Sequence, residues 1–454
     1  MWALKLQIGL ALLVLACGQI AFWRRRDNVL GYLAGGAFVS TLAVPLLLTG
    51  TISGNEPRYV RLYATVLSVG ALAYLAGLVL GHHLGSRAPN KVPLTFDRPL
   101  GGGAILAFVE RRARLLAAIG VGALVAGYLL LGYVPLTAAD RSSAKYGIGA
   151  YQDAYVRAAP VYLFALALSS TVLPVMLALY RTRRRPVDLV LAGMLGVGLL
   201  LSLSRDLAFT GPLIFVAAIA VERRVRPVLI VAAAAFVYIG GAVFNGVLFP
   251  TPGATHSAVD QIALSAPDVS DGIAFLDGFH SRGGEHTKGR TILAGLSPTA
   301  QEWDPSDYAL RTRTGLDDVS LLAAGGIRLP APIWGYASFG MAGVVWFCAL
   351  SGAFVGWATG KWKRLLGSVR SAPNVALNLT IAVAVYEGTF GLLAAFYEAS
   401  TGKVLTFVVA LLLGVRLSVR LASPPAPVPP APRRRATGPT PRPAARRLVP
   451  MPPR

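Results

Sequence analysis

The amino-acid sequence predicts an all-α protein, a polytopic integral membrane helical bundle of about eleven transmembrane helices (10–12) with one large extracytoplasmic loop. Of the 454 residues, 54% are hydrophobic and 14% are charged, and the mean hydropathy is +0.58. A soluble domain carries about 25% charged residues, so this chain has too few charged residues to form the polar surface of a soluble domain. Its apolar residues also fall in blocks of about 20, the length of a helix that crosses a ~30 Å hydrocarbon core.

The apolar blocks give the order of the elements. The sixth and seventh are short, and Arg205 with Asp206 divides what can also be one hairpin near the membrane surface. The candidate spans cover residues 3–22, 29–50, 59–80, 115–134, 158–180, 187–204, 207–221, 227–249, 332–358, 375–396 and 403–419.

Charge predicts the orientation of these spans. With alternating sides, the segments after the odd-numbered spans hold most of the 43 Lys and Arg residues but few of the 21 Asp and Glu residues. The positive-inside rule then places the N-terminus outside and the C-terminus in the cytoplasm. The net charge of +22 is therefore interpreted as a topology signal, and no nucleic-acid partner is expected.

Hydropathy divides the chain into four parts. Residues 1–249 hold the first eight spans and an exterior loop at 135–157, and residues 330–420 hold the last three spans. The large extracytoplasmic loop, 250–329, has aromatic and aliphatic residues spaced through it, which predicts short helices on the membrane surface. The Pro/Arg-rich segment 421–454 is predicted to be a disordered cytoplasmic tail that is attracted to anionic lipid or docks a cytoplasmic partner.

Two stretches of the large loop, 280–290 and 308–318, concentrate charge and contain glycine with arginine. This composition suits an anionic pyrophosphate, because glycine lets backbone N–H groups approach and a guanidinium binds two oxygens. It is equally the composition of a solvated surface, and both interpretations stay open. His280 and His286 have no third ligand at metal-binding spacing, so neither a metal nor a cofactor is expected.

Ionisable residues also lie beside and within apolar spans. Such charges are costly at membrane depth and are either functional or paired internally. Arg205 and Asp206 are therefore candidates for a functional site or for a local ion pair in an outer turn. Glu387, in the tenth span, is a candidate general base, a partner of a cavity arginine, or a hydrogen-bonded structural carboxylate.

Three stretches between about residues 120 and 360 are similar in pattern to one family. They are Gly132–Leu136 followed by Ala139–Arg141, Ser204–Arg205 before a new span, and Gly289–Leu296 followed by Pro332–Gly343. In this order they resemble the oligosaccharide repeat unit (O-antigen) polymerases of bacterial surface polysaccharide assembly.

The resemblance implies a metal-independent glycosyltransferase in the cytoplasmic membrane of a bacterium. It would transfer the growing glycan from its polyprenyl diphosphate carrier onto a new lipid-linked repeat, with release of polyprenyl diphosphate on the outer face. The partners that the resemblance implies are polyprenyl-diphosphate-linked oligosaccharide, membrane lipid, a flippase and a chain-length regulator. The alternatives are an O-antigen ligase-like glycan transferase and, in a different class, a lipid-linked oligosaccharide transporter or flippase.

The chemistry that the resemblance implies selects the candidate site residues. A departing diphosphate needs cations, and an acceptor hydroxyl needs a base. The predicted diphosphate ligands are Arg141, Arg205, Arg290, Arg311 and Arg313. The candidate bases are Glu285, His286 and Asp317.

Overall fold

The computed structural model describes most of the chain. All regular structure among the described residues is helical and none of it is strand, which confirms the all-α class. Asp317, Glu387, the tail 421–454 and most of the last two predicted spans lie outside the described residues. The described residues are 1–22, 28–43, 46–47, 55–87, 103–223, 225–248, 268–294, 303–316, 327, 329–370, 380, 392–398, 404 and 408.

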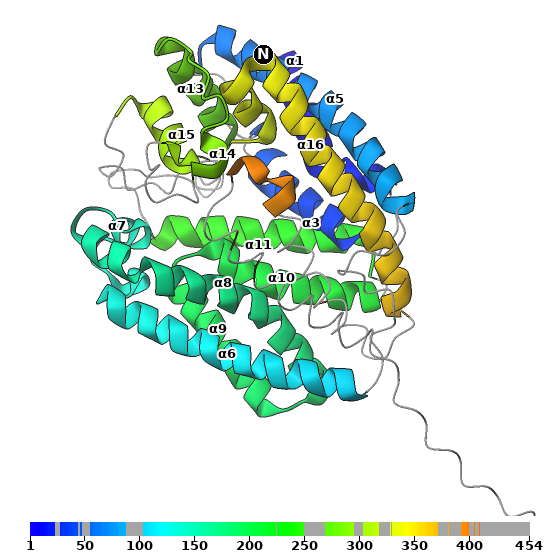
Figure 1. The fold of residues 1–454 in the computed structure, drawn as a ribbon, viewed down its shortest axis with the longest axis vertical. Coiled ribbons are helices and arrows are strands. Elements are labelled where there is room, and N and C mark those ends of the chain that lie inside the picture. The colour runs from blue at the N-terminus through cyan, green and yellow to red at the C-terminus, as the bar shows by residue number, and fades with distance from the viewer. Residues whose placement is uncertain are drawn as a thin grey trace, which may run out of the picture.

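The helices pack together in a bundle (Figure 1). In chain order they are α1 (Trp2–Cys17), α2 (Gln19–Phe22), α3 (Val29–Phe38), η1 (Val39–Ala43), α5 (Pro57–Arg87), α6 (Gly103–Leu131), η2 (Pro135–Thr137), α7 (Arg141–Tyr146), η3 (Gly149–Tyr151), α8 (Gln152–Arg183), α9 (Pro186–Leu201), α10 (Arg205–Glu222), α11 (Pro227–Leu248), α13 (Asp268–Ser281), α14 (Thr291–Ala294), α15 (Pro305–Thr314), α16 (Ala331–Arg370) and η6 (Phe396–Glu398). Among the residues that the structure describes, four helices are long and apolar enough to cross a membrane, namely α5, α6, α8 and α16. With the shorter apolar helices beside them, these make the chain a membrane-embedded protein.

The helices α5 and α16 pack with their backbones in contact. A Cβ added to Gly81 of α5 would overlap the Ala353 carbonyl oxygen, and one added to Gly356 of α16 would overlap the Leu78 carbonyl oxygen. Small residues at every fourth position let two membrane helices approach this closely. The glycines that form this zipper are Gly77, Gly81 and Gly85 on α5 and Gly352, Gly356 and Gly360 on α16.

The helix α16 is broken near its beginning. Phe339 (φ −144°, ψ 23°) and Gly340 (φ 63°, ψ −149°) are not helical, and the positive φ at the second position favours glycine. A Cβ on Gly335 would overlap the Gly343 carbonyl oxygen, although residues eight apart stand about 12 Å apart along a continuous helix. The segment before the break therefore folds back on the long part of α16, and the predicted span 332–358 is not one straight helix.

The helices α1, α5 and α16 run in the same direction. Gln7 near the start of α1 donates a hydrogen bond to Ser68 of α5 at 3.0 Å, while Gly18, just after α1, packs against Tyr74 further along α5. The glycine zipper likewise aligns α16 with α5 in ascending order. Alternating spans require this direction for the first, third and ninth of them, and it brings the N-terminal ends of α1 and α5 to one end of the bundle.

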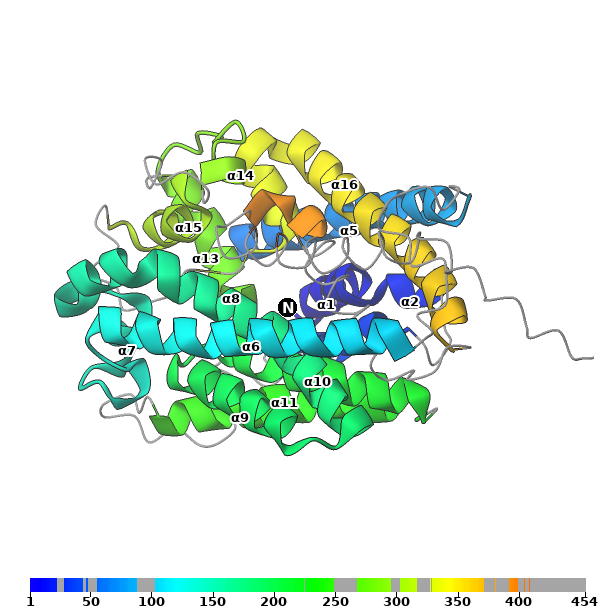
Figure 2. The ribbon, with the colours of Figure 1, turned by 60° about the horizontal axis from the view of Figure 1, so that its bottom comes forward.

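The helices α6, α8, α9 and α10 form a group of their own (Figure 2). They share an apolar core that is separate from the core around α5 and α16. Asp188 at the start of α9 is fully buried. Arg114 of α6 donates to both of its carboxylate oxygens, from Nε at 2.6 Å and from Nη2 at 2.9 Å. This bidentate ion pair joins α6 to α9.

The connection between α6 and α8 is shorter than the predicted loop 135–157. It holds η2, α7 and η3, and α8 already begins at Gln152. Tyr155 accounts for the early start, because its ring packs on Tyr162 of the same helix and against Gly147. The first turns of α8 are thus packed against the connection.

Candidate functional site

Aromatic and titratable side chains meet where α5 begins, α13 ends and α16 folds back. Nε2 of His280 lies 3.1 Å from the Tyr336 hydroxyl. The His280 ring stacks on Tyr59 with 6.0 Å between ring centroids, and the Arg58 guanidinium lies 4.6 Å over the Tyr59 ring. We call Arg58, Tyr59, His280, His286 and Tyr336 the His280 cluster.

The end of α13 explains how two histidines of one stretch become neighbours. Gly283 donates to the His280 carbonyl at 3.2 Å and Gly284 to the Phe279 carbonyl at 3.0 Å, and both glycines have positive φ. This is the hydrogen bonding of a glycine-capped helix end. The chain therefore reverses its direction, and the centroid of the His286 ring lies 6.1 Å from the centroid of the Tyr336 ring.

The segment around His286 is held by the break in α16. Thr287 N–H donates to the Ala337 carbonyl at 3.0 Å, and Lys288 N–H donates to the Ser338 carbonyl at 3.1 Å. The break frees these carbonyls from α16, and the loop satisfies them. Since an unsatisfied backbone group costs several kcal/mol in a membrane, these bonds fix the loop on the folded-back segment.

The electrostatic setting of His280 favours its neutral form. Burial lowers the pKa of His280, and the charges of Arg58 and His286 lower it further. A neutral imidazole has one nitrogen that accepts a proton. At neutral pH the cluster therefore offers a base next to the Tyr336 hydroxyl.

The predicted loop arginines have different surroundings. Arg290 is exposed, and its guanidinium lies 5.0 Å over the Trp303 ring. Arg311 is half-buried in α15, where it lies close enough to Asp307 to lower the pKa of that carboxyl against the effect of burial. Arg313 forms an ion pair with Asp271 of α13 at 3.0 Å. Of these three, Arg290 is the one best placed to meet a ligand from solvent.

The other predicted residues are spread more widely. Arg141 begins α7, donates to the Leu136 carbonyl at 3.1 Å and belongs to the group around η2 and η3. In both views α7 lies on the left, the side on which α13 and α15 also lie (Figures 1 and 2). Arg205 begins α10, and its side chain lies outside the described residues. Glu285 is exposed beside His286, and Asp317 lies outside the described part of the chain.

Sequence reasoning missed several members of the site. It considered His280 only as a metal ligand and did not single out Tyr59, Tyr336 or Glu398. Glu398 of η6 accepts a hydrogen bond at 3.0 Å from Nε1 of the buried Trp334. These pairs join residues far apart in the chain, and spacing along the sequence carries no signal for them.

Within the described part of the chain, no group of three or more His, Cys, Asp or Glu residues is placed to hold a metal ion. No protein-family model, curated protein or solved structure matches this chain. The chemistry that the site offers is an exposed guanidinium for an anionic group and a neutral imidazole for a hydroxyl proton.

Arg313→Gln is expected to loosen α15 from α13. The cost is roughly 1–2 kcal/mol, because Asp271 is 8% exposed and loses its cation, while Arg313 is 40% exposed and partly screened by water. Burial raises the pKa of Asp271 and Arg313 lowers it, so the substitution raises it further. The folded variant then binds more protons than the unfolded one, and its stability falls as the pH rises.

Thermal unfolding in detergent at about pH 5 and pH 8 measures this effect, since the ordinary pKa of an aspartate lies near 4. Arg313→Lys keeps a cation near Asp271 and is the matched control. Unfolding temperatures of Arg313→Gln that match the control at both pH values would contradict the role of the ion pair.

Proposed function

We propose that the protein polymerises polyprenyl-diphosphate-linked oligosaccharide repeat units on the outer face of the cytoplasmic membrane. The bond between the anomeric carbon of the growing glycan and its diphosphate breaks, and a glycosidic bond to a hydroxyl of the new lipid-linked repeat forms. The hydroxyl proton passes to a base, and polyprenyl diphosphate leaves. The reaction requires no redox partner and no nucleotide.

The observation that carries the proposal is the His280 cluster at the N-terminal end of α5. A neutral base lies on α13 and an exposed arginine lies in the turn just before α14, at the end that the charge pattern assigns to the outside. A glycosyl transfer with a diphosphate leaving group needs this pair of functions.

The roles follow from the surroundings of each residue. His280 accepts the proton, because its charged form is disfavoured. Arg290 binds the diphosphate, because its guanidinium is exposed while the Trp303 ring supports one of its faces. His286 lies against the break in α16, where a Cβ added to Gly340 would come within 3.3 Å of its Nε2.

A transporter of the same lipid is the main competitor from another class, and transporters contain broken helices. In this chain the break at Phe339–Gly340 has a different use. The carbonyls that it frees accept hydrogen bonds from Thr287 and Lys288, so it anchors a loop that carries candidate catalytic residues. This favours an enzyme.

The test uses the purified protein in lipid vesicles with lipid-linked oligosaccharide extracted from the source cells. A ladder of products, with one polyprenyl diphosphate released for each new linkage, supports polymerisation. Transfer of glycan only onto an acceptor without polyprenyl diphosphate would identify a ligase. Movement of the lipid across the vesicle membrane without a new linkage would identify a flippase, and either result overturns the proposal.

Arg58→Gln is expected to shift the acid limb of the pH–rate profile to higher pH. The Arg58 charge is one of the causes that lower the pKa of His280, so its removal raises that pKa. Because only the neutral imidazole accepts a proton, the variant loses rate at a pH where the wild type is still active. Initial rates between about pH 4.5 and pH 8 check this.

The matched control is Arg61→Gln, which removes an exposed arginine one turn further along α5. Its acid limb should coincide with that of the wild type. An unshifted limb in Arg58→Gln would show that His280 is not the titrating base.

A further inference from the structure

The loop between α13 and α14 contains a tight turn that is fixed on the break in α16. Lys288 (φ 53°) and Gly289 (φ 79°) both have positive φ, and Arg290 N–H donates to the Thr287 carbonyl at 3.1 Å. Two successive residues with positive φ inside such a bond fit a type I′ turn. Thr287 is buried, and its hydroxyl donates to the Ser338 hydroxyl at 3.3 Å. We call residues 287–290 the Lys288 turn.

Lysine is an unusual residue for its place in this turn. The central positions of a type I′ turn favour glycine, asparagine and aspartate, because a longer side chain is strained at positive φ. The Lys288 side chain is exposed, as is that of Arg290. Among the residues that the structure describes, no carboxylate forms an ion pair with either of them. The turn therefore holds two exposed cations in a fixed place, one on each side of Gly289.

An exposed apolar surface begins at the same turn. A Cβ added to Gly289 would come within 3.2 Å of Cζ of Phe339, so the Phe339 ring lies directly against the turn. Phe339 is 48% exposed, and Met341, Val345 and Trp346 in the first turns after the break are 39%, 44% and 67% exposed. This part of α16 belongs to a helix that is long and apolar enough to cross a membrane. We call these four side chains the Phe339 face.

The charge of the turn decides which lipid fits. Every exposed face of a membrane helix meets hydrocarbon, so the Phe339 face alone selects no ligand. A zwitterionic headgroup brings its own cation, which Lys288 and Arg290 repel. A diphosphate offers oxygens to an ammonium and to a guanidinium at once. The two surfaces together fit a long apolar chain that ends in a diphosphate.

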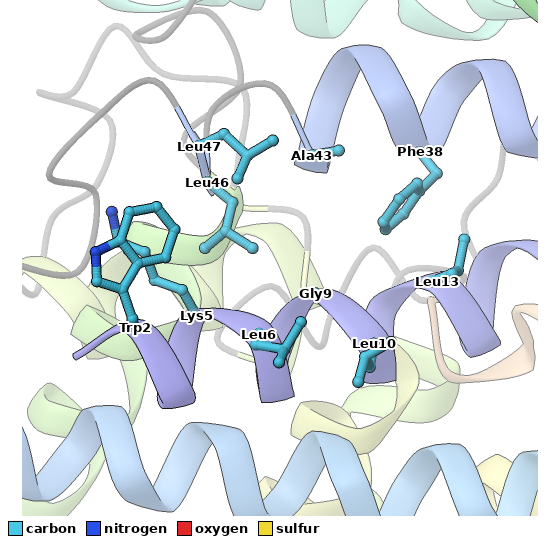
Figure 3. Close-up of a pocket in the computed structure, with 10 residues that line it drawn as sticks. All are labelled: Trp2, Lys5, Leu6, Gly9, Leu10, Leu13, Phe38, Ala43, Leu46 and Leu47. Carbon is cyan, nitrogen blue, oxygen red and sulfur yellow. The ribbon is translucent and has the colours of Figure 1, made fainter.

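A second apolar surface lacks this combination. A pocket of about 270 Å³ lies between α1 and the residues that follow α3 (Figure 3). Lys5 is the single charged residue of its lining, and the Lys5 ammonium group lies 5.4 Å over the Trp2 ring. No second cation in the lining stands beside Lys5, so this pocket serves as the comparison surface for labelling.

We infer that the polyprenyl chain of the diphosphate carrier lies on the Phe339 face, with the diphosphate bound by Lys288 and Arg290. The inference rests on the proposed function, and it adds a second diphosphate ligand and the side from which the carrier enters. The break in α16 also joins the turn to the His280 cluster, because His286 packs against Gly340 and its ring lies near Tyr336. A carrier bound there holds its anomeric carbon near the base, which lowers the entropic cost of the reaction.

The test is photolabelling of the full-length protein in phosphatidylcholine vesicles with a polyprenyl diphosphate that carries a diazirine in its first isoprene units. The labelled peptides are expected to cover residues 339–350. An excess of unlabelled polyprenyl diphosphate should remove the label, and the same excess of phosphatidylglycerol should leave it. Equal competition by phosphatidylglycerol would overturn the inference, as would labelling confined to other segments, such as residues 2–13 and 38–47 of the pocket.

Lys288→Gly separates binding from folding, because glycine suits the positive φ and removes only the cation. The variant should unfold at the wild-type temperature or above, while its specific labelling should fall about fivefold through loss of one exposed ionic contact. Lys288→Arg keeps a cation and should keep the label. The matched control is Arg157→Gln, which removes an exposed arginine of α8 and should leave labelling unchanged. Wild-type labelling of Lys288→Gly would overturn the role of Lys288.

Glycan extension distinguishes a failure of this inference from a failure of the proposed function. Specific labelling of residues 339–350 without any glycan extension would contradict the proposed function and leave the binding assignment intact. Glycan extension by the wild-type protein with labelling confined to other segments would contradict the binding assignment alone.

Discussion

His280→Ala is expected to slow glycan extension by roughly 10²–10⁴-fold at neutral pH, the range over which a positioned general base contributes. Burial, and next the charge of Arg58, lower the pKa of the His280 imidazole, and alanine offers no proton acceptor in its place. The measurement is the initial rate of product formation in vesicles at saturating lipid-linked oligosaccharide. The acid limb of the pH–rate profile should also disappear.

Two controls separate chemistry from structure in this experiment. Tyr336→Phe removes the hydroxyl that lies 3.1 Å from His280 and keeps the imidazole, so a loss of only a few-fold is expected, the size of one neutral hydrogen bond. Thermal unfolding shows whether His280→Ala is folded. A folded His280→Ala variant with the wild-type rate would rule out the assigned role.

Gly81→Leu is expected to have the largest effect on stability. Its side chain would start inside the Ala353 carbonyl oxygen, so α5 and α16 would have to move apart along the whole zipper. Overpacking a well-packed interface costs about 1–3 kcal/mol and sometimes more, and a collision with backbone lies at the upper end, at about 3 kcal/mol or above. The measurements are the yield of folded protein and its unfolding temperature in detergent.

The matched control for this substitution is Gly122→Leu in α6. A Cβ at Gly122 meets nothing within 4 Å, so the same change of residue meets open space there. Its unfolding temperature should stay close to that of the wild type. Equal losses in the two variants would mean that leucine destabilises these helices by itself and that the zipper is not what holds α5 and α16 together.

The membrane class and the helical fold were predictable because both depend on local properties of the chain. A block of about 20 apolar residues has to bond its backbone internally in hydrocarbon, and only a helix does so within one segment. The parallel course of α1, α5 and α16 is likewise what alternating spans require. The extent of α8 was less predictable, because its first turns are held by contacts of Tyr155 and not by hydropathy.

The sequence indicates only one half of the glycine zipper. Glycines recur every fourth residue at Gly77, Gly81 and Gly85, which is the spacing of a close helix contact. The sequence does not indicate which helix packs against these glycines. The pairing with α16 appears only when the two backbones are seen to touch.

Local sequence was thus sufficient for the helical, membrane-embedded class of the protein. The tertiary structure decided which distant residues come into contact. His280 came to lie against Tyr59 because α13 packs on α5, and against Tyr336 because α16 folds back at its break. Proximity between distant residues depends on packing of whole helices, and a linear pattern of residue types does not encode it.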